Sequence, residues 1–134
     1  MPRYLLDTNV VIAATRGEGV IAAKLGEIDA ADLILSPIVL GELEFGVEKS
    51  RLKKQNRQRL QRLIQALPVA PMDAETSRQY GLIRASLESC GQPIGANDYW
   101  IAAQALALEA VLVTDNEREF RRVPDLVVEN WLRV

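Results

Sequence analysis

The segment RYLLDTNVVI, residues 3–12, places one carboxylate between two short apolar runs. The first run, YLL, has the composition of a short buried strand that ends immediately before Asp7. Burying a charge is costly, so a charge between two apolar segments is expected where the chain meets solvent or a ligand. We therefore expect Asp7 to stand at the carboxyl end of a strand, where the chain leaves the interior of a sheet.

The rest of the chain alternates strand patterns with helix patterns. Further strands are predicted at residues 32–36, 110–114 and 125–130, and residues 67–73 form a break with room for a short strand. Helices are predicted at residues 19–28, 37–49, 52–67, 74–90 and 96–109, and a turn or short helix at 116–120. This alternation indicates an α/β fold with a central, mostly parallel sheet flanked by helices, and we expect residues 1–134 to form a single domain.

The composition excludes several kinds of active site. The chain has 134 residues, no histidine and one cysteine, Cys90. Without histidine there can be no Ser–His–Asp triad, no Cys–His pair and no zinc site built from Cys and His ligands. Any enzymatic chemistry would therefore rest on carboxylates, with a hard metal ion as their natural partner.

The sequence also favours a cytoplasmic protein. One cysteine allows no internal disulfide, which suits a reducing compartment. No apolar run approaches the roughly 18 residues that a membrane-spanning helix needs, and the N-terminus lacks the basic-then-apolar pattern of a secretory signal.

Two acids are predicted at strand ends. Asp7 ends the first strand, and Asp115 directly follows the strand at 110–114. In open α/β sheets, ligands bind outside the carboxyl ends of the strands, so both acids are expected at one edge of the sheet. Each also has a simpler interpretation, because Asp-Thr-Asn and Asp-Asn are common in turns.

Two further acids lie within apolar helix faces. At 100° per residue, Glu42 falls on the face of the 37–49 helix that carries Val39 and Leu43, and Asp98 falls with Ile101 and neighbouring alanines. Glu42 could instead pair with an arginine, and Asp98 could simply stabilise a helix start. Taken together, converging carboxylates without histidine are typical of Mg²⁺ or Mn²⁺ sites. A site of this kind suits the hydrolysis of a phosphodiester.

The motifs LLDTNVVI (residues 5–12), LSPIVLGELEFGVEKS (35–50) and IGANDYWIAAQALALEAVLVTDNEREF (94–120) resemble the PIN-domain ribonucleases. They look most like the VapC toxins of bacterial toxin–antitoxin pairs. The resemblance covers nearly the whole chain, and the ordered set of motifs is more specific than the DTN motif alone.

The resemblance implies a catalytic and metal-binding set of acids. Asp7, Glu42 and Asp98 match the family's three metal-binding acids. The residues that match its supporting polar positions are Thr8, Asn9 and Thr114. The fourth acid stays open, because Asn116 stands where many members have Asp, with Asp115 and Glu119 on either side as candidates.

The resemblance also implies an activity and partners. It implies a Mg²⁺-dependent (or Mn²⁺-dependent) endoribonuclease that arrests translation by cutting RNA, often tRNA or ribosomal RNA. It implies a VapB-type antitoxin, a homodimer, and a higher-order toxin–antitoxin complex. The alternatives are a PIN-domain nuclease in RNA maturation or turnover, and a non-catalytic nucleic-acid-binding module.

A basic stripe provides a candidate RNA track. Residues 49–62 hold seven Lys and Arg residues and no acid, although the net charge of the whole chain is −2. Lys53, Lys54 and Arg57 are the residues we expect to contact RNA phosphates, and the alternative is a solvated helix face.

Overall fold

The computed structural model describes residues 2–133, and within them four parallel strands form one sheet in the order β2-β1-β3-β4. The strands are β1 (Tyr4–Leu6), β2 (Leu33–Ile34), β3 (Val111–Val113) and β4 (Val128–Glu129). In the register, Leu5 lies opposite Ile34 on one side and Leu112 on the other. The prediction of an α/β fold with a parallel sheet is confirmed.

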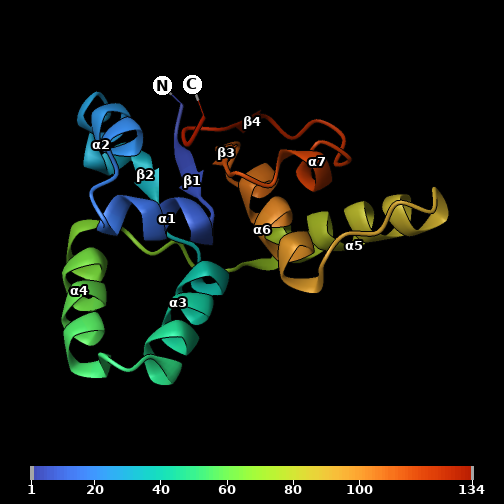
Figure 1. The fold of residues 1–134 in the computed structure, drawn as a ribbon. Helices are drawn as coiled ribbons and strands as arrows, with labels where there is room; N and C mark the ends of the chain where they lie inside the picture. Colours follow the sequence, from blue (N-terminus) through green and yellow to red (C-terminus); the bar gives the residue numbers. More distant parts are fainter. Residues whose placement is uncertain (1, 134) are drawn as a thin grey trace.

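Seven α-helices and one 3₁₀ turn surround the sheet in residues 2–133 (Figure 1). They are α1 (Thr8–Thr15), α2 (Gly19–Gly26), η1 (Ala30–Asp32), α3 (Pro37–Lys49), α4 (Lys53–Ala66), α5 (Ala74–Ser89), α6 (Ala96–Ala107) and α7 (Glu117–Phe120). Figure 1 shows α2 on one side of the strands and α6 on the other, with α3 and α4 as a helical hairpin below them. The predicted helices are confirmed to within a few residues at their ends, and none in the described range is long and apolar enough to cross a membrane.

Local signals explain where α3 begins and where α5 begins and ends. The Ser36 hydroxyl accepts a hydrogen bond from the backbone N–H of Ile38 at 3.1 Å, and Pro37 opens α3 without losing a helical hydrogen bond. The Asp73 carboxylate caps α5 in the same way, by accepting from the N–H of Thr76 at 2.9 Å. Gly91 follows α5 with φ +68°, the left-handed conformation in which glycine carries no steric penalty.

Helix α1 is the element that hydropathy alone did not predict. Its residues Val10, Val11 and Ala13 are buried, so the segment lacks the polar face that marks a surface helix. The helix starts because the Asp7 carboxylate accepts a hydrogen bond from the N–H of Thr8 at 2.8 Å. The acid that seemed to separate two apolar runs therefore joins a strand to a helix.

The core lies between the sheet and these helices. Its fully buried side chains include Leu5, Val10, Ile101, Leu112 and Phe120, which come from β1, α1, α6, β3 and α7. Because all four strands are parallel, their carboxyl ends meet at a single edge. Polar residues follow three of the strands directly, namely Asp7 after β1, Thr114 after β3 and Asn130 after β4. The candidate site lies at this edge.

Candidate active site

Asp7 is the most buried of the predicted acids. It follows β1 directly, the residue is 8% exposed, and its backbone N–H donates to the carbonyl of Val113 at 2.9 Å. The Thr114 hydroxyl donates to the Asp7 carboxylate at 2.7 Å. Burial raises the pKa of Asp7, the hydrogen bonds from Thr114 and Thr8 counteract that rise, and the nearby Glu42 charge adds to it.

Glu42 reaches the same edge from α3. The Thr8 hydroxyl donates to one of its carboxylate oxygens, and the side-chain amide of Asn97 donates to the other at 3.1 Å. Both oxygens of Glu42 are thus oriented by residues from α1 and α6. The hydrogen bond from Thr8 to Glu42 is the contact that its predicted supporting role requires.

Asp98 lies in the first turn of α6, close to Glu119 of α7. Burial is the largest influence on Asp98, followed by a hydrogen bond with Glu119 and by repulsion from Asp7, Glu119 and Glu42. Together they raise the pKa of Asp98 to about 7. A hydrogen bond between two carboxyl groups requires a proton on one of them, and the raised pKa of Asp98 places that proton on Asp98 below about pH 7.

Gly95 gives the Asp98 carboxyl the room that it occupies. A Cβ atom on Gly95 would lie 3.2 Å from an oxygen of Asp98, tighter than an ordinary van der Waals contact. Gly95 also precedes α6 as its N-terminal flanking residue. An alanine there would require the carboxyl of Asp98 to move by a few tenths of an ångström.

Four acidic side chains therefore converge on one edge of the sheet: Asp7, Glu42, Asp98 and Glu119. Such a donor set, rich in carboxylate oxygens and lacking nitrogen and sulfur ligands, suits Mg²⁺ or Mn²⁺. Within residues 2–133, however, no three acidic or cysteine side chains are arranged to hold a metal ion as they lie. We expect some of these side chains to rotate when a metal binds, because their oxygens now accept hydrogen bonds from Thr and Asn side chains.

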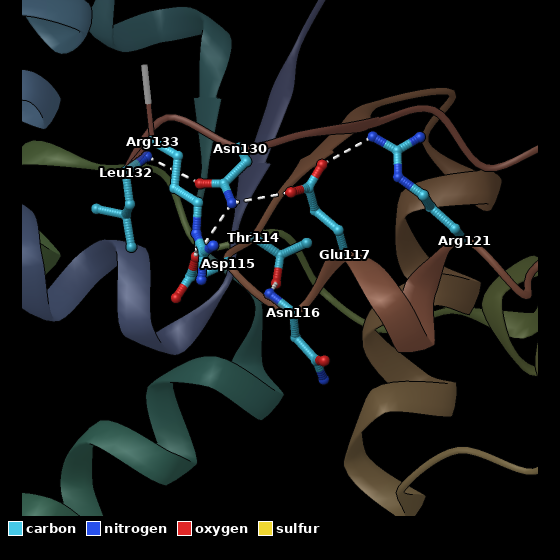
Figure 2. A network of polar contacts seen from close by, with 8 residues as sticks. All are labelled: Thr114, Asp115, Asn116, Glu117, Arg121, Asn130, Leu132 and Arg133. Carbon is cyan, nitrogen blue, oxygen red and sulfur yellow. Dashed lines mark hydrogen bonds and ion pairs between the residues drawn. The ribbon is translucent and has the colours of Figure 1, made fainter.

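Asp115 and Glu119, the two candidates for the fourth acid, are placed differently. Asp115 accepts hydrogen bonds from Asn130 at 3.0 Å and from Arg133 at 3.1 Å, and these lower its pKa (Figure 2). Glu119 contacts Asp98 and accepts from the amide of Asn116 at 3.0 Å. The structure brings Glu119 together with the other acids, whereas the contacts of Asp115 are with the C-terminal segment.

The remaining predicted residues fall into two groups. Thr114 and Asn116 each hold a site acid, and the Asn116 N–H also donates to the Thr114 hydroxyl at 3.0 Å. Asn9 is exposed in the first turn of α1 and makes no side-chain hydrogen bond within residues 2–133. Its predicted supporting role has no contact in this state of the protein.

The basic stripe is partly neutralised. Arg57 forms ion pairs with Glu44 and Glu48 of α3, and Lys53 pairs with Glu48 at 3.0 Å. Lys54 is exposed and has no ion pair in the described range. Of the three residues expected to contact RNA, two are therefore already engaged in joining α4 to α3.

Sequence reasoning missed two residues of this edge. Asn97 orients Glu42, and its only signal in the sequence is its place beside Asp98 at a helix start. Asn130 donates to Asp115 and also to Glu117 at 3.1 Å. Its signal was available, because Asn130 is the polar residue that ends the last predicted strand, 125–130.

Comparison with known proteins identifies the family of this chain. Residues 4–126 match the PIN domain family. The chain is 39% identical over 130 residues to Ribonuclease VapC2 of Rickettsia felis, covering 96% of this chain and 97% of that protein. It is 31% identical over 131 residues to the tRNA(fMet)-specific endonuclease VapC of Shigella flexneri, covering 98% and 99% of the two chains.

Solved structures give the same result. A chain of VapBC2 from Rickettsia felis, bound to a DNA fragment from its promoter, matches with a TM-score of 0.89 and 38% identity over 96% of this chain and 98% of that chain. DNA-bound VapBC from Salmonella typhimurium matches with a TM-score of 0.91 and 33% identity over 98% and 99%. The chain therefore belongs to the PIN-domain family, and within it to the group of VapC proteins.

Proposed function

We propose that this protein is a Mg²⁺- or Mn²⁺-dependent endoribonuclease that acts as the toxin of a VapBC-type pair. The observation that carries the catalytic part is the convergence of Asp7, Glu42, Asp98 and Glu119 in a chain without histidine. Similar proteins named ribonuclease or tRNA(fMet)-specific endonuclease support RNA as the substrate.

Asp7 and Asp98 are the primary candidates to hold the metal, with Glu42 and Glu119 beside them. In such a site the metal supplies polarisation of a water molecule and neutralisation of charge on the phosphate. The protein's own residues set the geometry: Thr114 fixes Asp7, Thr8 and Asn97 fix Glu42, and Asn116 fixes Glu119. Because metal ligands must be deprotonated, a proton that Asp98 keeps below about pH 7 would have to leave before Asp98 could hold a cation.

The proposal extends to partners. The matched structures from Rickettsia felis and Salmonella typhimurium are VapBC complexes, which supports a VapB-type antitoxin as the partner of this chain. We further propose that the protein is cytoplasmic, forms a homodimer and a higher-order complex with its antitoxin, and inhibits translation by cutting tRNA or ribosomal RNA.

The test of the activity is cleavage of total RNA by purified protein with Mg²⁺ and with EDTA. We expect discrete cuts that require Mg²⁺ and disappear in Asp7→Asn and in Asp98→Asn, because each change removes a carboxylate from the cluster. Asp125→Asn is the matched control, since Asp125 is exposed and its φ of +66° suits asparagine. Full activity of Asp7→Asn, or Mg²⁺-dependent cutting that is lost in the control, would contradict the assignment.

The same assay identifies the fourth acid. Glu119→Gln should lower cleavage far more than Asp115→Asn, because Glu119 contacts Asp98 whereas asparagine at 115 can still accept from Asn130. The toxin role is tested by inducing the wild-type chain and Asp7→Asn in growing bacteria. Growth arrest by the wild type alone, relieved by its antitoxin, is the expected result, and continued growth with the active enzyme would favour a role in RNA maturation.

A further inference from the structure

Asn130 lies at the carboxyl edge of the sheet but outside the acidic cluster. It follows β4 directly, as Asp7 follows β1 and Thr114 follows β3. Its side-chain amide donates to Asp115 at 3.0 Å and to Glu117 at 3.1 Å, and its oxygen accepts from the N–H of Leu132 at 2.9 Å. Figure 2 shows this amide between the two carboxylates. Both N–H groups and the oxygen are thus engaged at once.

The segment that Asn130 contacts is the loop that orients two of the site acids. Residues 114–117 alternate in their contacts. Thr114 and Asn116 bind Asp7 and Glu119, whereas Asp115 and Glu117 are bound by Asn130. The loop is therefore held from both sides, by the acidic cluster on one side and by the residue that follows β4 on the other.

A neutral amide suits this position for an electrostatic reason. The hydrogen bond from Asn130 is the largest cause of the lowered pKa of Asp115. For Glu117 the hydrogen bond from Arg121 lowers the pKa most and that from Asn130 comes second, and both shifts favour the anionic form. Arg133 and Arg121 complete the neutralisation from the exposed side, with contacts of 3.1 Å to Asp115 and 2.8 Å to Glu117. An acid at position 130 would add a third negative charge and remove the donors.

We propose that Asn130 is a positioning residue of the nuclease site: by bridging Asp115 and Glu117 it fixes the 114–117 loop, and through that loop the carboxylates of Asp7 and Glu119. This inference rests on the proposed function for its catalytic consequence. It also assigns a role to Asp115, which anchors the loop rather than joining the acids that face the substrate.

The test compares Asn130→Asp and Asn130→Ala with the wild type. Asn130→Asp keeps the shape but loses the donors, and Asn130→Ala loses every contact of the amide. We expect kcat for RNA cleavage to fall about 10-fold or more in both, with KM for RNA little changed, because residues that orient catalytic groups typically have effects of this size. Arg121→Ala is the matched control, because it removes one contact of Glu117 and leaves Asn130 in place.

A second readout needs neither metal nor substrate. Amide hydrogen exchange at Asn116, whose N–H donates to the Thr114 hydroxyl, reports the order of the loop. We expect faster exchange there in both Asn130 variants than in the wild type or Arg121→Ala. Wild-type exchange at Asn116 and wild-type kcat in Asn130→Ala would overturn the inference, as would a loss of activity that only follows the fraction of unfolded protein. A wild-type chain that cleaves no RNA would instead contradict the proposed function, while the exchange rates would still test Asn130.

Discussion

At the scale of single residues, the pair formed by Asp98 and Glu119 carries the most information. The pKa of Asp98 rises to about 7, first through burial, then through the hydrogen bond with Glu119 and the charges of three acids. Keeping acids close together in spite of their mutual repulsion lowers the stability of the fold. Such clusters are typical of functional sites rather than of a core selected for stability.

The raised pKa predicts a pH dependence of stability in the metal-free protein. Between pH 4 and pH 7 the folded chain keeps a proton at Asp98 that the unfolded chain has lost. The free energy of unfolding should therefore fall as pH rises through this window. Asp98→Asn should remove the part of this dependence that Asp98 causes and leave the part due to Asp7, whose pKa is also raised. Because water screens a partly exposed group, we expect Asp98→Asn to gain only about 1–2 kcal/mol over the wild type at pH 8.

Urea unfolding in EDTA at pH 4.5 and pH 8 measures this difference. Asp125→Asn serves as the control, since Asp125 lies in an exposed turn and is not among the acids that raise the pKa of Asp98. If the wild type and Asp98→Asn lose the same stability between the two pH values, Asp98 does not hold the extra proton.

At the scale of elements, α4 shows that a charged stripe can have more than one role. Lys53 and Arg57 face α3 and pair with Glu48 and Glu44. Arg59 projects from a different side of the helix, where it lines a groove of about 250 Å³ whose lining also includes Glu42. Arg59 and Arg62 line a second groove beside it, and both are exposed without an ion pair in the described range.

The two arginines Arg59 and Arg62 are therefore the part of the stripe that we expect to contact RNA phosphates. Each lost phosphate contact on single-stranded RNA reduces the slope of log K against log salt by about 0.7. We expect the double variant Arg59→Gln and Arg62→Gln to flatten the slope by about 1.4, and Lys53→Gln with Arg57→Gln to flatten it less.

Binding should be measured on the Asp7→Asn background, so that RNA is not cut during the titration. The two double variants serve as matched controls for each other, because each removes two positive charges from the same helix. If the slope of log K against log salt flattens more in the Lys53 and Arg57 variant, RNA binds to the residues predicted from the sequence instead.

At the scale of the whole molecule, the site joins elements that are distant in the sequence. Asp7 follows β1, Glu42 comes from α3, Asp98 from α6 and Glu119 from α7. Since a ligand that binds only the folded chain stabilises it, Mg²⁺ should raise the Tm of the entire protein. At 100 times the Kd the expected gain is about 2.7 kcal/mol, which corresponds to several degrees for a chain of this length.

Thermal unfolding with MgCl₂, and with NaCl at equal ionic strength, measures this effect. Asp7→Asn combined with Asp98→Asn should lose the Mg²⁺-specific part of the rise, while Asp125→Asn keeps it. An equal rise in all three proteins would mean that Mg²⁺ acts elsewhere than at the acidic cluster.

The sequence by itself determined the order of strands and helices apart from α1, the parallel sheet, and a converging set of acids that includes Asp7, Glu42 and Asp98. Periodicity and capping residues carry these features because they depend on neighbours within a few residues, as Ser36 and Asp73 show. The chain order of the motifs also carried the resemblance to the PIN-domain family, which the match over residues 4–126 bears out.

Only the tertiary structure decided which polar residues meet. It distinguished Glu119 from Asp115, paired Lys53 and Arg57 with α3, and placed Asn97 and Asn130 in contact with acids far away in the chain. No local pattern contains this information, because a side chain four residues away and one 55 residues away can be equally good hydrogen-bond partners. Helix α1 was not predicted for a related reason. Its middle is a continuous apolar run that is packed into the core, so the sequence shows no polar face, and the acid that caps it is also a member of the site.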